Sequence, residues 1–158
     1  MAILAGAVTG PVAAAGAPPV RSSLLWATVN ICDTGAHPDT VGVRGAMPGS
    51  GVAAEQMHLR IRLQYLSGPE DEWRDLGAAG DSGWMTLGSA RVKQRQAGRS
   101  FVLRTAQANT VLRGLVSFEW RRDGDVVRRA RRQTAAGHGP TAGADPAGYS
   151  TSRCRVAG

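Results

Sequence analysis

The chain has 158 residues, of which 42% are hydrophobic and 20% are charged, and its formal net charge is +7. This length suits one domain with a packed core and is too short for two ordinary domains. The apolar share excludes general disorder, even with 21 glycines. The basic residues are all arginine except Lys93. An excess of this kind affects solubility and non-specific binding and does not by itself define a site.

The first segment, residues 1–20, reads MAILAGAVTGPVAAAGAPPV and carries no charged side chain. Its small and apolar residues and the Ala-x-Ala pattern at Ala13 to Ala15 favour a secretory leader, although no Lys or Arg follows Met1. Prolines interrupt the run, so we expect no transmembrane span. The prediction is a leader or a disordered N-terminal segment over 1–20, one β-sandwich domain over 21–158, and a secreted or extracytoplasmic location.

The next segment, Ser23 to Cys32, is a predicted strand that ends at one of the two cysteines, Cys32 and Cys154. In an oxidising compartment such a pair is predicted to form a disulfide. Closing so long a loop stabilises a fold by about 4 to 5 kcal/mol on the chain-entropy model. The alternative is two unrelated buried thiols. Neither cysteine belongs to a Cys-x-x-Cys or Cys/His cluster, so redox catalysis and a zinc site are not indicated.

Period-two alternation of apolar and polar residues recurs along the rest of the chain, and helical periodicity is nearly absent. MHLRIRLQY is the clearest case, since Met57, Leu59, Ile61 and Leu63 fall on one face while arginines fall on the other. LRGLVSFEW repeats the pattern, and its Gly114 is expected to mark a bulge. The remaining predicted strands are 41–45, short pieces at Trp73 and Trp84, 100–105, 126–134 and 149–156.

The stretch LRIRLQYLSGPEDEWRDLG, Leu59 to Gly77, has an apolar strand that ends near a tyrosine and turns back into a tryptophan-containing strand. It resembles the hairpin of immunoglobulin-like and fibronectin type III-like domains in exported bacterial proteins. The resemblance implies a β-sandwich and carries over no functional residue, because such modules host many activities. The cysteines do not follow the usual inter-sheet pattern with a tryptophan between them.

Four tryptophans divide into two pairs. Trp26 and Trp120 lie inside alternating strands and are predicted to belong to the core. Trp73 and Trp84 begin short strands beside glycine-rich loops, in WRDLG and WMTLG. Packing within the hairpins is the simpler expectation for this second pair, and contact with a glycan is the alternative.

The run WRRDGDVVRRARRQ, Trp120 to Gln133, concentrates arginines around Asp123-Gly124, which is a strong hairpin signal. Arginine on both faces of its second arm predicts an edge strand, where charge also deters strand-to-strand aggregation. The hairpin is either a solvated protective edge or a salt-sensitive contact for acidic polymers. No nucleic-acid-binding module is recognisable, so specific nucleic-acid recognition is not expected. The candidate contact residues are Arg121, Arg122, Arg128, Arg129, Arg131 and Arg132.

Catalytic motifs are not found in the sequence. His37, beside Asp33 and Asp39, is the nearest approach to a ligand cluster, and the acidic run Glu70, Asp71, Glu72 and Asp75 falls in a predicted turn. A secreted hydrolase built on these residues is the weakest hypothesis. We expect no metal and no cofactor.

The sequence therefore predicts an all-β, immunoglobulin-like antiparallel β-sandwich of about eight or nine short strands, with a jelly roll as the alternative. The expected function is that of a non-catalytic secreted or envelope-associated module that acts through surface contacts, with an acidic cell-envelope polymer or glycan as partner. Its alternative is a carbohydrate-binding module that uses Trp73 and Trp84.

Overall fold

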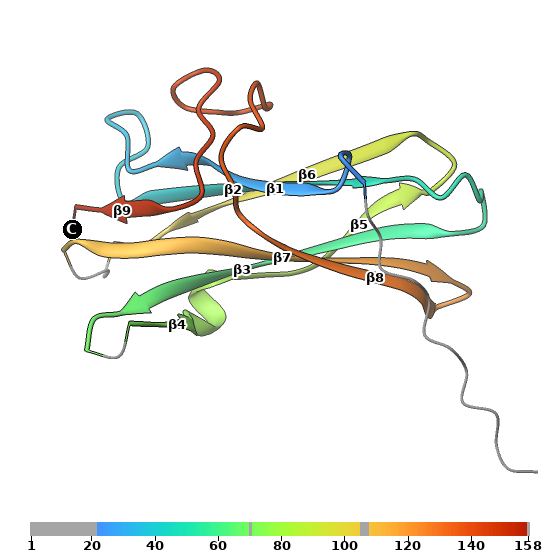
Figure 1. Ribbon diagram of the computed structural model, residues 1–158, viewed down its shortest axis with the longest axis horizontal. Coiled ribbons are helices and arrows are strands. Elements are labelled where there is room, and N and C mark those ends of the chain that lie inside the picture. Colours follow the sequence, from blue (N-terminus) through green and yellow to red (C-terminus); the bar gives the residue numbers. More distant parts are fainter. Residues whose placement is uncertain (1–21, 70, 105–107, 158) are drawn as a thin grey trace, which may run out of the picture.

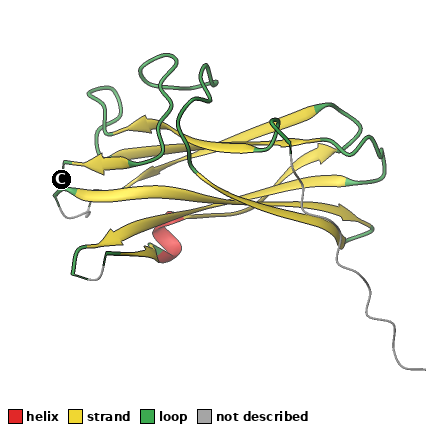
Figure 2. Ribbon diagram, in the orientation of Figure 1, coloured by secondary structure: helices red, strands yellow, loops and turns green. Residues whose placement is uncertain are grey.

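Alternating apolar residues form an antiparallel β-sandwich in the computed structural model, which describes residues 22–69, 71–104 and 108–157. The expected leader over 1–20 lies outside the described residues. Figure 2 shows two layers of strands and a short helical turn. The elements are β1 (Trp26–Cys32), β2 (Thr40–Pro48), β3 (Gln56–Ser67), β4 (Glu72–Asp75), the 3-10 helix η1 (Gly77–Gly80), β5 (Asp81–Ser89), β6 (Gln94–Val102), β7 (Thr110–Arg122), β8 (Asp125–Gln133) and β9 (Cys154–Val156).

The strands divide into a three-stranded sheet with the order β1-β2-β6 and a six-stranded sheet built around β3 and β7. In the larger sheet β3 pairs with β7 along one side and with both β4 and β5 along the other. β7 in turn pairs with β8 and β9 along its far side. Figure 1 shows β1, β2 and β6 above β3, β7 and β8. The larger sheet is therefore four strands wide over most of β3.

The core lies between the sheets and contains the residues that alternation placed inward. Met57, Leu59, Ile61 and Leu63 of β3 have no exposed surface. Trp120 of β7 is also fully buried, and its indole N–H donates to the carbonyl of Pro48 over 3.0 Å. The inward prediction for these residues is confirmed, and the indole hydrogen bond satisfies the one polar group of Trp120.

Two glycines mark points where the sheets approach each other closely. A Cβ atom on Gly114 would lie 2.8 Å from the Cγ2 atom of Thr134 and 2.9 Å from a methyl group of Val43. A Cβ atom on Gly45 would lie 2.9 Å from a methyl group of Leu59. The bulge expected at Gly114 is wrong, because the β3–β7 register runs through it without a shift. The glycine instead makes room for the opposing sheet.

The segment between β8 and β9 crosses from the larger sheet to cover the outer face of β1 (Figure 1). Its backbone hydrogen bonds reach Ala27, Val29 and Asn30 of β1. Trp26 stacks on His138 of this segment, with ring centroids 4.9 Å apart and an interplanar angle of 6°. The prediction of a core role for Trp26 is wrong, because its ring lies outside the inter-sheet core and beneath this covering segment.

The predicted disulfide is present and joins Cys32, at the end of β1, to Cys154, at the start of β9. Their Cα atoms are 5.4 Å apart and 122 positions separate them in sequence. Since β1 and β9 belong to different sheets, the disulfide links the two layers of the sandwich. No helix among the described residues is long and apolar enough to cross a membrane.

Two predicted strands differ from the observed ones. Residues 100–105 were expected as a strand, but β6 runs over Gln94–Val102 and pairs with β2 throughout. Residues 149–156 contain only the three-residue β9, and Thr151 makes an isolated bridge to Val29. The other predicted strands are found with small differences at their ends.

Candidate functional site

The outer face of the six-stranded sheet collects arginines from four segments of the chain. On β3, Arg60 and Arg62 alternate with fully buried residues and so point away from the core. On β7 and β8 the same alternation directs three arginines of the β7–β8 hairpin outward, and Arg113 and Arg153 extend the set toward β9. We call this surface the basic face; its defining residues are Arg60, Arg62, Arg113, Arg121, Arg129, Arg131, Arg153, Trp73 and Trp84.

Strand register brings distant residues into one row across this face. Arg60 pairs with Ser117, and Ser117 pairs with Arg131. On the other side of β3, Arg60 pairs with Trp84 of β5. Residues directly opposite one another on neighbouring strands have their side chains on the same face. The row therefore consists of Trp84, Arg60, Ser117 and Arg131, in that order. It ends at the edge strand β8.

A shallow, open groove of about 570 Å³ lies over this row. Its walls carry the guanidinium groups of Arg60, Arg62, Arg129 and Arg131, together with the ring of Trp84. Trp84 is 37% exposed, which leaves part of its ring accessible to a ligand. The groove combines positive charge with an accessible apolar surface.

Three carboxylates on the basic face neutralise only part of its charge. Asp75 accepts from Arg62 at 2.7 Å, and Asp81 accepts from Arg60. Glu119 lies 2.6 Å from Arg121 and 3.5 Å from Arg129. Among the residues that the structure describes, Arg113, Arg131 and Arg153 have no carboxylate partner. The face therefore keeps a net positive charge.

The pKa shifts on this face follow from these contacts. The hydrogen bond from Arg60 lowers the pKa of Asp81 below its usual value and raises the pKa of Arg60 itself. Burial lowers the pKa of His58, and the positive charge of Arg121 lowers it further against the opposing effect of Glu119. His58 is thus an uncharged neighbour of the groove at neutral pH.

Each tryptophan of the basic face has an arginine against its ring. The guanidinium carbon of Arg121 lies 5.0 Å from the ring centroid of Trp84. Trp73 has two such neighbours, Arg113 at 4.2 Å and Arg153 at 5.2 Å. These distances fall within the range of cation–π attraction. The arginine–tryptophan contacts hold the rings on the outer face, at the β4 and β5 side of β3.

The six arginines predicted as one contact strip are divided between several surroundings. Three of them belong to the basic face: Arg121, Arg129 and Arg131. Arg128 lies on the opposite side of β8, where its guanidinium carbon is 5.7 Å from the ring centroid of Trp120. Arg132 pairs with the inward-facing Val116 and shares the side of Arg128. Arg122 donates to Glu55 over 2.7 Å. The predicted edge position of β8 is confirmed, since β8 ends the strand order of its sheet.

The hairpin turn itself has the predicted form. Arg122 pairs with Asp125 across the two-residue loop Asp123-Gly124. Both loop residues have positive φ, 52° and 89°. Positive φ at both positions is the requirement of a type I′ turn, which Asp-Gly favours.

Four residues of the basic face were not predicted as contact residues: Arg60, Arg62, Arg113 and Arg153. Alternation already directed Arg60, Arg62 and Arg113 outward, so the signal for exposure was present in the sequence. What was missing was the pairing of β3 with β7 and of β7 with β9, which places them beside the hairpin.

His37, the residue considered for a hydrolase, belongs to a small hydrogen-bonded cluster with Thr34 and Asp145. Its Nδ1 atom lies 2.9 Å from the Oδ2 atom of Asp145, and the Thr34 hydroxyl donates to the same carboxylate oxygen. That hydroxyl bond, with a smaller contribution from His37, lowers the pKa of Asp145. The Thr34 hydroxyl thus donates to the carboxylate and not to the imidazole. Among the described residues no three His, Cys, Asp or Glu side chains gather to hold a metal ion.

Comparison with protein-family models gives no matching family, and comparison with curated proteins gives no significant match.

Proposed function

We propose that the basic face binds an acidic polysaccharide outside the cytoplasm and that the protein acts as a non-catalytic binding module. The observation that carries this proposal is the presence of both outer tryptophans, Trp73 and Trp84, on one face with arginines that have no carboxylate partner among the described residues. A flat aromatic ring offers apolar contact to a sugar ring, and guanidinium forks match carboxylate or sulfate oxygens. An extracytoplasmic location is supported by the disulfide between Cys32 and Cys154.

The strand order supports a finer classification as an immunoglobulin-like or fibronectin type III-like domain. The small sheet, β1-β2-β6, corresponds to the A-B-E order of the immunoglobulin fold, and β3-β7-β8 corresponds to its C-F-G order. In this assignment β4 and β5 occupy the position beside strand C. A jelly roll is the alternative, and an experimental structure with its strand order would distinguish the two.

Calorimetric titration with four polymers tests the binding proposal. Heparin is sulfated, polygalacturonate is carboxylated, dextran is neutral, and duplex DNA is a polyanion without accessible sugar faces. We expect binding to an acidic polysaccharide, no binding to dextran, and weaker binding as salt rises, because ionic contacts are screened. Equal affinity for DNA would indicate unspecific attraction, and no binding to either acidic polysaccharide at low salt would contradict the proposal.

A pair of double variants with equal charge loss locates the binding surface. R129Q/R131Q removes two charges from the groove. R91Q/R99Q removes two exposed charges from the β5–β6 turn and from β6, away from the basic face. The first variant should weaken binding at least about tenfold and the second much less, because only the first removes contacts to the polymer. Equal weakening by both would show that net charge alone is responsible.

A further inference from the structure

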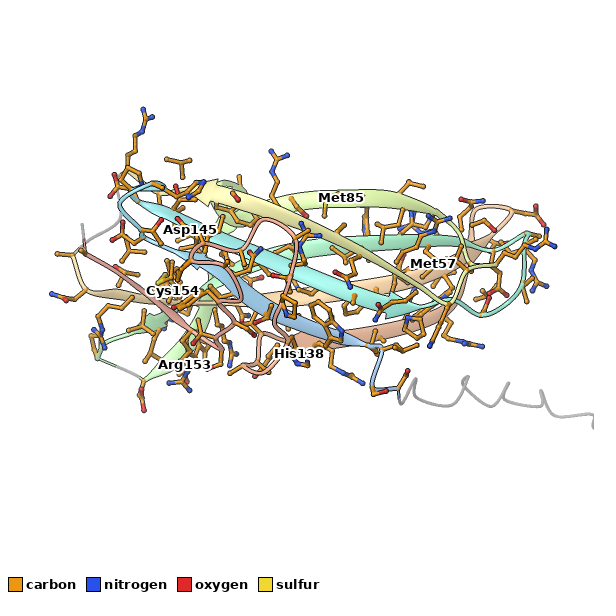
Figure 3. The ribbon with its side chains drawn as sticks, turned by 90° about the horizontal axis from the view of Figure 1, so that it is seen from above. Met57, Met85, His138, Asp145, Arg153 and Cys154 are labelled. Carbon is orange, nitrogen blue, oxygen red and sulfur yellow. A yellow bond between two sulfur atoms is a disulfide. The ribbon has the colours of Figure 1, made fainter. Side chains whose placement is uncertain are left out.

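Arg113 and Arg153 lie side by side at one end of the basic face. β7 pairs with β9 through Leu112 and Cys154. Arg113 follows Leu112 on β7, and Arg153 immediately precedes Cys154, the first residue of β9. Leu112 is buried, so its strand neighbour Arg113 points outward. Arg153, beside the buried Cys154, is exposed. Figure 3 shows Arg153 beside Cys154, at the end of the molecule away from Met57. Both guanidinium groups face the ring of Trp73, at 4.2 and 5.2 Å.

Neutral acceptors hold the guanidinium group of Arg113 in place. Its Nε donates to the side-chain oxygen of Gln64 over 2.9 Å, and its Nη1 donates to that of Gln133 over 3.1 Å. The amide of Gln64 is itself fixed, because its nitrogen donates to Asp75 over 2.8 Å. Asp75 also accepts from Arg62, so its charge is already engaged. Arg113 is therefore oriented without being neutralised.

The two positive charges also repel each other. Burial and the positive charge of Arg153 both lower the pKa of Arg113. Cation–π attraction to Trp73 offsets part of this cost, but no carboxylate among the described residues approaches either guanidinium. An oxyanion lying against both groups would remove the repulsion and accept charge-assisted hydrogen bonds from both forks.

We propose that Arg113, Arg153 and Trp73 form a subsite for one anionic substituent, a carboxylate or a sulfate ester, of the acidic polysaccharide. The sugar ring that carries this substituent lies against Trp73, while its oxygens accept from the two arginines. This inference rests on the proposed function, and it names the group of the polymer that the protein recognises.

Titration with single sugars tests the subsite separately from polymer binding. The probes are glucuronate, glucose 6-sulfate and unmodified glucose, and the readout is the NMR signal of the Trp73 indole N–H. We expect the two charged sugars, or one of them, to shift this signal and glucose to leave it unchanged. The comparison of the two charged sugars distinguishes carboxylate from sulfate. No shift with either at millimolar concentration would overturn the subsite.

Variants at the subsite complete the test. R153Q should weaken binding of the preferred acidic polysaccharide at least fivefold, and because Arg153 is exposed the variant should fold normally. R113K keeps the charge and loses the fork, so it should also weaken binding. R155Q removes an exposed charge two positions away on β9 and is the control.

The outcomes separate the subsite from the proposed function. If the unchanged protein binds the polymer and R153Q weakens this binding no more than R155Q does, the subsite is wrong and the proposed function stands. If the unchanged protein binds no acidic polysaccharide, the proposed function itself fails.

Discussion

The guanidinium group of Arg122 donates to the carboxylate of Glu55 over 2.7 Å, and the Glu55 side chain is only 8% exposed. Glu55 lies just before β3, whereas Arg122 lies at the tip of the β7–β8 hairpin. The Ser50 hydroxyl donates to the other carboxylate oxygen of Glu55. The pair therefore ties the end of the basic hairpin to the loop between the two sheets.

Substitution of Glu55 should destabilise the protein. E55Q leaves Arg122 and Ser50 without their charged acceptor, and the loss of a buried charge-assisted hydrogen bond costs about 1 to 3 kcal/mol. Urea denaturation measures the change in the free energy of unfolding. E72Q is the control, because Glu72 is exposed on β4. Equal stability of E55Q and the unchanged protein would contradict the structural role of Glu55.

The same carboxylate should make stability depend on pH. The hydrogen bond from Ser50, helped by Arg122 and opposed by burial, lowers the pKa of Glu55 from its usual value of 4.5. A carboxyl group whose pKa is lower in the folded state stabilises the fold above the unfolded pKa, and this stabilisation is lost as pH falls through the folded pKa. We expect the urea concentration at the unfolding midpoint to decrease as the pH is lowered below about 4.5. For E55Q this decrease should be less steep. E55Q should retain part of this pH dependence of stability, because the pKa of Asp81 is also lowered in the folded protein.

Gly114 should tolerate no side chain. G114A places a methyl group 2.8 Å from Thr134 and 2.9 Å from Val43, so the sheets must move apart. Overpacking of this kind costs about 1 to 3 kcal/mol. The control is G35A, since a Cβ atom on Gly35 meets nothing within 4 Å. Thermal denaturation of both variants measures the difference, and a G114A variant as stable as G35A would show that the sheets adjust freely.

Removal of the disulfide should be the most destabilising of these changes. The loop that it closes spans 122 positions, and the chain-entropy model gives about 5 kcal/mol for a loop of that length. C32A/C154A should therefore unfold at much lower urea concentration. Addition of reductant should lower the stability of the unchanged protein and leave that of C32A/C154A unaffected. A similar urea midpoint for both proteins would contradict the prediction.

Affinity for the acidic polysaccharide should rise with the length of the sugar chain. Trp84 pairs with Arg60 and Trp73 pairs with Leu66 on the same side of β3, which places the rings roughly 20 Å apart along the strand at ~3.3 Å per residue. A chain that reaches both rings gains from effective concentration. Calorimetry with fragments of increasing length should show a step in affinity, and W73A should remove the step. A smooth dependence on length in both proteins would argue against two linked contacts.

The sequence was most informative where burial on one face imposed strict alternation. β3 and β7 were predicted for this reason, and the β7–β8 turn was predicted because Asp-Gly meets the need for two positive φ angles. β6 was misplaced because, of its nine residues, Phe101 is the one buried apolar side chain and Gln94 to Ser100 lack an apolar rhythm. Its pairing with β2, which no local pattern encodes, defines it as a strand.

The basic face was predicted only in pieces. Alternation directed Arg60 outward and the hairpin pattern identified Arg131, yet their common row with Ser117 depends on the register between three strands. Register is set by the packing of whole sheets and not by neighbouring residues in sequence. The same limit explains Trp26, whose strand was predicted correctly while the segment that covers it, with His138, is an irregular loop.

The position of the disulfide has a mechanical consequence. Cys32 ends the first strand and Cys154 begins the last, so almost the whole sandwich lies between the two sulfur atoms along the chain. Tension applied to the polypeptide before Cys32 and after Cys154 would pass directly through the covalent bridge. The residues between them, which include the whole basic face, would carry almost none of that force. Oxidised, the protein would resist extension under a pull that unravels its reduced form.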